Sequence, residues 1–153
     1  MIRFAKLKDK IEVNQIRQQV HLLHATARPD IFRQDFDAAG ERYDFYIKQY
    51  EYAVLVCVRE EKIVGFAVIR NEVKQQSDFG VARKILLLEE FGVDVNCRGQ
   101  GVGAEMMNFV KQYAADHDSE SIVLDYWAFN NGAVDFYKEV GFDVYRVCAE
   151  YKV

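Results

Sequence analysis

The sequence lacks the features that mark a membrane, secreted or multidomain protein. Its 153 residues contain no apolar run of the ~18 residues needed to span a bilayer. The first residues alternate apolar and polar side chains, which is not the pattern of a signal peptide. No internal repeat, low-complexity segment or change in composition divides the chain. We therefore expect a single domain over residues 1–153, with no membrane partner.

Basic charge and metal-ligand patterns are also scarce. The formal net charge is -4, whereas nucleic-acid-binding domains usually carry a basic stripe, so no nucleic-acid partner is expected. The cysteines Cys57, Cys97 and Cys148 show no ligand spacing, which favours reduced thiols in a cytoplasmic protein and no metal site. His21 and His24 have no further ligand nearby, so we expect them in the core or in a substrate-pocket wall.

What the chain has is enough apolar sequence for a substantial core, since half of its residues are hydrophobic. Their patterns predict strands at 1–7, 52–59, 63–70, 84–93, 121–128 and 142–151. Helical spacing and capping residues predict helices at 9–28, 37–49, 104–116 and 130–141. The polar residues 71–83 predict a loop. Hairpins followed by right-handed crossovers are typical of an α/β (α+β) fold.

Glycine is concentrated in one stretch, Arg98-Gly99-Gln100-Gly101-Val102-Gly103, between an apolar strand and a helix. Three glycines in five residues let the backbone approach a ligand closely. The first amides of the following helix have no intrahelical partner and lie at the positive end of its dipole. The Arg98 side chain adds a cation that can bind phosphate oxygens. Together these features predict a phosphate-binding loop.

Two neighbouring motifs place this loop in a wider pattern. The loop fits the form Arg/Gln-x-x-Gly-x-Gly/Ala, and the strand before it ends in Glu90-Phe91-Gly92-Val93. Further along, residues 130–137 (NNGAVDFY) fit the form Asn-x-x-Ala-x-x-Phe-Tyr. With these motifs, which cover about residues 85–142, the sequence resembles the GCN5-related N-acetyltransferase (GNAT) family.

The resemblance implies a mixed, twisted sheet with helices on both faces, and acetyl-CoA (coenzyme A) as co-substrate. The loop backbone would hold the pyrophosphate, and the free edge of the preceding strand would pair with the pantetheine arm. The implied reaction is transfer of acetyl to a primary amine by direct attack on the thioester. The implied cofactor-binding residues are Phe91, Gly92, Val93, Arg98, Gly99, Gln100, Gly101, Val102, Gly103, Asn130 and Tyr137.

The resemblance also suggests catalytic residues. Tyr137 is the candidate proton donor to the leaving thiolate, because a phenol with a pKa near ~10 is protonated at neutral pH. Glu90 is the candidate base, through a water or as an anchor for a cation; a salt-bridged pair is an equal alternative. Glu89 is expected on the opposite face of the strand, since side chains alternate. Asp125 is a further carboxylate candidate, and a backbone amide near 91–93 would stabilise the oxyanion.

The amine acceptor stays open, as a small molecule or a peptide. Residues 21–32 and 71–83 are expected to form its pocket. Arg28 and Asp30 either bind the acceptor's charges or pair with each other. The aromatic C-terminal strand is compatible with a homodimer.

Two other functions fit parts of the sequence. One is a non-catalytic module that binds acetyl-CoA or a partner. The other is a dinucleotide-binding protein, because Gly99-x-Gly101-x-x-Ala104 matches a dinucleotide fingerprint and Asp125 has the spacing of its ribose-binding acid. Residues 94–97 separate the strand from the first glycine, which counts against that fingerprint.

Overall fold

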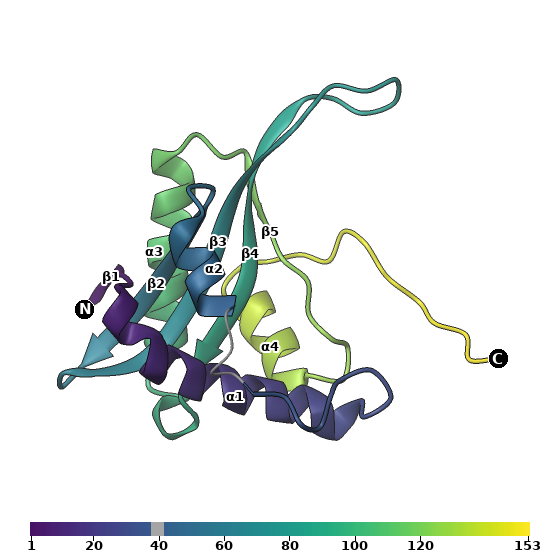
Figure 1. Ribbon diagram of the computed structural model, residues 1–153. Helices are drawn as coiled ribbons and strands as arrows, with labels where there is room; N and C mark the ends of the chain where they lie inside the picture. The colour runs from purple at the N-terminus through teal and green to yellow at the C-terminus, as the bar shows by residue number, and fades with distance from the viewer. Residues whose placement is uncertain (38–41) are drawn as a thin grey trace.

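The computed structural model describes residues 1–37 and 42–153, and its centre is one mixed sheet (Figure 1). The strands are β1 (Ile2–Phe4), β2 (Tyr52–Arg59), β3 (Lys62–Lys74), β4 (Arg83–Val93) and β5 (Ser121–Val123). They lie in the order β1-β2-β3-β4-β5; the pairs up to β4 are antiparallel, and β4 and β5 are parallel. This mixed topology confirms the expected α/β (α+β) fold, and it is not the doubly wound parallel sheet of a dinucleotide-binding domain.

Helices cover both faces of the sheet. Those of the described residues are α1 (Lys10–Ala27), α2 (Arg42–Lys48), α3 (Val102–Asp116) and α4 (Asn131–Glu139), with short 3-10 turns at Leu7–Asp9 and Val95–Cys97. Part of the helix predicted at 37–49 falls on residues 38–41, outside the described residues. Helix α1 ends one residue before Arg28, as expected ahead of Pro29.

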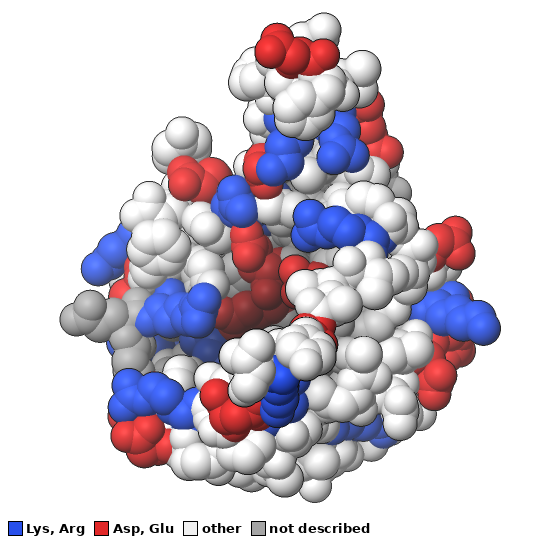
Figure 2. Space-filling model, turned by 90° about the vertical axis from the view of Figure 1, so that its right-hand side faces the viewer, with Lys and Arg blue, Asp and Glu red and all other residues white. Residues whose placement is uncertain are grey.

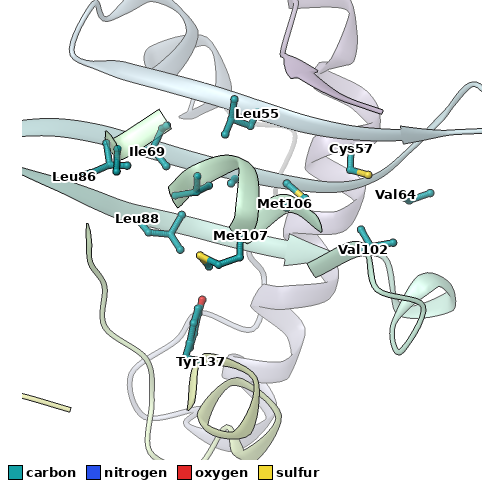
Figure 3. Packing of buried hydrophobic residues seen from close by; sticks show 13 residues of the cluster. Leu55, Cys57, Val64, Ile69, Leu86, Leu88, Val102, Met106, Met107 and Tyr137 are labelled. Carbon is teal, nitrogen blue, oxygen red and sulfur yellow. The ribbon is translucent and has the colours of Figure 1, made fainter. Parts of the chain in front are cut away.

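Each face of the sheet has its own buried cluster. On the α3 face, Leu55, Ala67, Ile69, Leu86 and Leu88 pack against α3 residues and Tyr137 of α4 (Figure 3). On the α1 and α2 face, side chains that alternate with these pack against the two helices; they include Val54, Val56, Phe66, Val68, Ile16, Tyr43 and Tyr46. The alternation along each strand therefore divides the core into two layers.

A β-bulge interrupts the pairing of β3 with β4 beside two acidic residues. Val68 is paired with Glu90, but the next residue, Ile69, is paired with Leu88, which leaves Glu89 as the extra residue. The expectation that Glu89 and Glu90 point to opposite faces is therefore wrong. Arg70 Nε donates to Glu89 at 2.7 Å, while Tyr46 of α2 donates to Glu90 at 3.0 Å. The bulge places both carboxylates on the α1 and α2 face.

Strand β4 extends well beyond its parallel partner. The ladder with β5 joins only 85–87 to 121–123, although β4 continues to Val93. We call residues 88–93 the open β4 edge, because β5 does not pair with them. This edge leads directly into the glycine-rich loop and positions the site described below.

Two other segments differ from the sequence-based expectation. Strands β3 and β4 extend into the predicted 71–83 loop, which leaves only 75–82 as the tip of a long hairpin that projects from the body (Figure 1). The strand predicted at 142–151 is wrong: these residues are in no strand and run away from the sheet. A strand needs a hydrogen-bonded neighbour, and the described chain supplies none there. Every helix in the described residues is too short or too polar to cross a membrane.

Candidate active site

The glycine-rich loop has the geometry of an anion cradle. Gly99 and Gly101 have φ values of +71° and +79°, in the left-handed region that favours glycine. A Cβ on either residue would meet no atom within 4 Å, so both open to free space. Among the described residues, the backbone amides of 99–104 donate no hydrogen bond to another protein group. These amides and the positive end of the α3 dipole fit a pyrophosphate.

Side chains brace this loop against its surroundings. Arg98 Nε donates to the carbonyl of Val93 at 3.2 Å, and Gln100 Nε2 donates to the carbonyl of Asn96 at 2.9 Å. From the end of β2, Arg59 donates to the Gln100 carbonyl at 3.2 Å. The loop is therefore held by two of its own side chains and by one of its carbonyls, while its amides stay available.

Glycine also allows close packing on both sides of the loop. A Cβ on Gly92 would lie 2.8 Å from the Phe66 ring and 3.1 Å from Ile16 of α1. A Cβ on Gly103 would lie 3.0 Å from the Phe136 ring of α4. These two glycines allow α1 to pack closely on β4, and α4 to pack closely on α3.

Tyr137 is the polar residue at the centre of the α3 face. It is 8% exposed and lies against the rings of Phe91, Tyr126 and Phe142. Figure 3 shows its hydroxyl directed from α4 towards the sheet residues and α3. Burial raises the pKa of Tyr137 to about 12, with a smaller contribution from the negative charge of Asp125. The hydroxyl therefore keeps its proton throughout the neutral range, as a proton donor must.

Glu90 lies in a charged network on the opposite face. Arg17 of α1 donates from Nε to its Oε2 at 2.7 Å, and Tyr46 donates to its Oε1 at 3.0 Å. Arg42 lies 3.3 Å from the same Oε1. The Arg17 side chain is only 7% exposed, and it also donates to Asn14 at 2.6 Å. The ion pair is thus largely desolvated and fixes the carboxylate in place.

Sequence reasoning missed Arg17, Tyr46 and Arg42. One signal was available for Arg17: it follows Val13 by four residues and precedes Val20 by three, so it lies on the buried stripe of its helix. A charged residue on such a stripe indicates a buried partner of opposite charge. Nothing in the local sequence identifies Glu90 as that partner.

The other predicted residues take less central positions. Asn130 caps α4, because its Oδ1 accepts a hydrogen bond from the Ala133 amide at 3.1 Å. Asp125 is exposed beyond the end of β5. Arg28 and Asp30 pair with each other through two hydrogen bonds of 2.8 and 2.7 Å, as one of the two expectations had it.

Aromatic side chains surround the end of α1. The His24 ring stacks on Phe32 at 5.2 Å, and Phe32 contacts Trp127 edge to face at 5.2 Å. Burial lowers the pKa of His24, and the neighbouring His21 lowers it further. Within 1–37 and 42–153, no three His, Cys, Asp or Glu residues are arranged to hold a metal ion.

The two segments expected to form one acceptor pocket are not brought together. The β3–β4 hairpin projects away from α1, so the tip at 75–82 does not meet residues 21–32 (Figure 1). Figure 2 shows instead a hollow with acidic side chains deep inside it and Lys and Arg side chains around its rim. An acidic interior of this kind suits a cationic ligand.

An open β4 edge that leads into a glycine-rich loop and a helix N-terminus is the arrangement expected of an acyltransferase that uses a coenzyme. The family model described as "Acetyltransferase (GNAT) family" matches residues 18–142. This chain therefore belongs to the GNAT acetyltransferase family. Its mixed sheet flanked by helices is the fold of the family's solved members.

Individual relatives agree with this assignment. An uncharacterized N-acetyltransferase from Methanocaldococcus jannaschii, MJ1207, is 29% identical over 106 residues, which are 66% of this chain. The matched part is 43% of that protein, so this chain spans less than half of the length of that curated relative. A mutant of the BH1408 protein from Bacillus halodurans is 29% identical and has a TM-score of 0.95, with 100% of this chain and 99% of that chain covered.

A more distant structure contributes to the fold comparison only. The aminoglycoside N-acetyltransferase AAC(6')-Iy, solved with CoA, is 14% identical and has a TM-score of 0.73. The superposition covers 100% of this chain and 98% of that chain.

Proposed function

We propose that this chain is an N-acetyltransferase that moves the acetyl group of acetyl-CoA to a primary amine by direct attack on the thioester. The observation that carries the proposal is the continuity of the open β4 edge with the free amides of residues 99–104. This surface combines an unpaired strand edge for amide groups with a cradle for phosphate. The coenzyme supplies the activated acetyl group and a thiolate leaving group.

The proposed coenzyme site follows the chain from β4 into α3. Backbone groups of Phe91, Gly92 and Val93 would pair with the pantetheine amides. The loop residues Arg98, Gly99, Gln100, Gly101, Val102 and Gly103 would bind the pyrophosphate through their amides. Asn130, which caps α4, and Tyr137, two turns further along the helix, would contact the same ligand.

Tyr137 is the proposed proton donor to the departing thiolate. Its raised pKa, its burial and the direction of its hydroxyl support this role. An amide near Phe91–Val93 is the proposed donor to the thioester oxygen, because the open edge leaves strand amides without a β5 partner.

Glu90 is the proposed acidic group on the acceptor side, as a base acting through a water or as an anchor for the ammonium group. Its ion pair with Arg17 fixes its position but also competes for its negative charge. The acceptor is a small-molecule or peptide amine, which suits the acidic hollow of Figure 2.

The proposal is tested by measuring thiol release from acetyl-CoA with a panel of amines, together with coenzyme A binding by calorimetry. Gly101→Val should weaken coenzyme binding by about tenfold to a hundredfold, because its φ of +79° strains any side chain. Gly132→Ala, on exposed α4, is the matched control and should bind normally. Tight coenzyme binding without turnover on any amine would instead support a non-catalytic acetyl-CoA module.

A further inference from the structure

Two arginines lie beside Glu90, and they differ in how much of each is accessible. Arg17 is buried, with its guanidinium 6.0 Å from the ring centroid of Tyr46 and 5.4 Å from that of Phe66. Its Nε and Nη1 both donate to protein acceptors. The Arg42 side chain, at the start of α2, is 64% exposed. Arg42 is therefore the arginine of this pair that a ligand can contact from solvent.

The protein uses only one nitrogen of the Arg42 guanidinium. Its Nε donates to the Tyr46 hydroxyl at 3.0 Å and lies 3.3 Å from Oε1 of Glu90. Among the residues that the structure describes, no acceptor is bonded to its two Nη groups. Such groups form a forked pair of hydrogen bonds with a carboxylate. A carboxylate bound there would lie next to Glu90, at the entrance to the charged network.

The charges around Glu90 do not cancel. One carboxylate lies between two arginines, so this group has one positive charge in excess. The neighbouring ion pairs of the same face, Arg70 with Glu89 and Lys74 with Glu72, are balanced. A ligand that carries only positive charge would therefore add to the excess. A ligand with an anionic group beside its amine would compensate it.

The same order of charges runs from the inside of the site to its surface. Figure 2 shows acidic side chains deep in the hollow and Lys and Arg side chains around its rim. Within the network, the Glu90 side chain is 18% exposed, whereas that of Arg42 is 64% exposed. An amine that enters the site reaches the carboxylate, while an anionic group attached to it stays beside the arginine. This order fits a zwitterion that enters with its amine first.

An aromatic surface lies next to Arg42 on α2. Phe45 follows Arg42 by three residues, so the two side chains are neighbours on the helix surface, and Phe45 is 49% exposed. Its ring contacts those of Tyr46 and Tyr52, each at 5.6 Å between centroids. The Arg42 guanidinium lies 5.8 Å from the Tyr46 ring centroid. An apolar side chain can therefore pack on Phe45 while a carboxylate of the same molecule pairs with Arg42.

We propose that the acceptor is a free α-amino acid with an apolar side chain, and that Arg42 binds its carboxylate. The proposal rests on the proposed acetyl transfer and names the class of amine. The amine nitrogen bonds to the acetyl carbon as the C–S bond of the thioester breaks. The thiolate takes its proton from Tyr137, and the ammonium group releases its protons on the Glu90 side, one of which returns to Tyr137 through solvent. The products are an N-acetyl amino acid and coenzyme A.

The first test compares two acceptors that share a side chain. Thiol release from acetyl-CoA is measured with L-phenylalanine and with phenethylamine, which lacks the carboxylate, and each rate is expressed per neutral amine. The value of kcat/KM for L-phenylalanine should be about tenfold to a hundredfold higher, mainly through KM, as expected for one charge-assisted contact. Equal or faster turnover of phenethylamine, or a preference for spermidine, overturns this proposal but leaves acetyl transfer standing. No turnover on any amine contradicts acetyl transfer itself, and this proposal with it.

The second test assigns the preference to Arg42. Arg42→Gln should raise KM for L-phenylalanine about tenfold or more and bring its ratio to phenethylamine close to one, whereas Arg42→Lys should retain part of the preference. Arg83→Gln, an exposed arginine at the start of β4, is the matched control and should keep the wild-type ratio. A preference that survives Arg42→Gln overturns the proposal.

Calorimetry makes the same comparison without turnover. In the presence of coenzyme A, the wild-type chain should bind N-acetyl-L-phenylalanine about tenfold or more tightly than N-acetylphenethylamine, and Arg42→Gln should remove this difference. Equal affinity of the wild-type chain for the two products would show that the carboxylate is not recognised, and the proposal would be wrong.

Discussion

The two faces of the sheet are built from different chemistry. On the α3 face, the buried cluster is aliphatic and sulfur-containing, and Tyr137 is its one hydroxyl-bearing member among the described residues. On the α1 and α2 face, the apolar cluster borders ionised groups, among them the buried Arg17 and Asp9. Burial raises the pKa of tyrosines on both faces, to about 12 for Tyr137 on the first face and for Tyr43 and Tyr46 on the second. The second face holds carboxylates in place through arginine.

This difference separates the two proton-transfer tasks of the proposed reaction. A proton donor has to carry its proton at the working pH, and burial, which raises the pKa of Tyr137 to about 12, keeps its hydroxyl protonated there. A group that receives a proton from an amine has to remain ionised and in contact with water. The Glu90 side chain is 18% exposed and is held by hydrogen bonds from Arg17 and Tyr46, so it has a fixed position and access to water. The bulge at Glu89 places both carboxylates on the α1 and α2 face, while Leu88 and Phe91 of the same strand pack on the α3 side.

The largest expected effect is on the charged face. Arg17→Met should lower the free energy of unfolding by about 3–5 kcal/mol, because it leaves Glu90 partly buried without its main partner. Urea denaturation followed by circular dichroism measures this loss. Combining Arg17→Met with Glu90→Met should restore most of the stability, since no unpaired charge remains. A double variant as unstable as the single one would show that Arg17 contributes through packing and not through its charge.

The next largest effect is expected on the α3 face, where a substitution should lower turnover and leave stability nearly unchanged. Tyr137→Phe should lower kcat about 100-fold, or about 2.7 kcal/mol, with coenzyme A affinity nearly unchanged. Its unfolding free energy should change little, because Phe keeps the ring contacts. Tyr126→Phe, whose ring lies 5.5 Å from that of Tyr137, is the matched control and should retain turnover. Equal activity of Tyr137→Phe and wild type would remove the tyrosine from the mechanism.

Local sequence predicted the α3 side of the site well. The turn glycines, the α4 cap and the helix boundaries depend on residues a few positions apart, and the structure has them where they were expected. Gly141, for example, ends α4 with a φ of +92°, as a glycine after a helix should. Family motifs reflect the same local contacts, and this is why the glycine-rich loop could be located from the sequence.

The α1 and α2 side could not be predicted in this way. The ion pair of Arg17 with Glu90 joins residues 73 positions apart, and no local pattern encodes it. The alternation of side chains along a regular strand predicted the wrong face for Glu89. A bulge changes that alternation, and the sequence here contains no residue pattern that identifies the bulge. The strand predicted at 142–151 failed for a related reason. Its apolar residues alternate as in a strand, but no described strand lies beside these residues to pair with them.

The third prediction concerns how stability depends on pH through one ion pair, that of Arg3 with Asp9. Arg3 donates to both oxygens of Asp9 at 2.6 and 3.0 Å, and this pairing holds the pKa of the Asp9 carboxyl below its usual value. A carboxyl with a lowered pKa stabilises the fold above its unfolded-state pKa, and this contribution is lost as the pH falls through its folded-state pKa. The free energy of unfolding should therefore decline below about pH 4.

Asp9→Asn should cost about 2 kcal/mol at pH 7 and flatten this acid-side decline. Thermal unfolding between pH 2 and pH 7 compares the variant with the wild type. Asp116→Asn, at the exposed end of α3, is the control and should leave the decline unchanged. A decline of the same steepness in Asp9→Asn would assign the acid sensitivity to other carboxylates.

The smallest effect lies outside both faces, in the turn between β2 and β3. Glu60 and Glu61 have φ values of +48° and +63°, which non-glycine residues rarely adopt. Glu61→Gly should therefore raise the free energy of unfolding by about 1 kcal/mol, as expected for a two-residue hairpin turn that favours glycine. Because the change touches neither Tyr137 nor Glu90, turnover should stay at the wild-type value. A gain in stability with lost turnover would mean that this turn, through Arg59 and its hydrogen bond to the Gln100 carbonyl, controls the shape of the coenzyme loop.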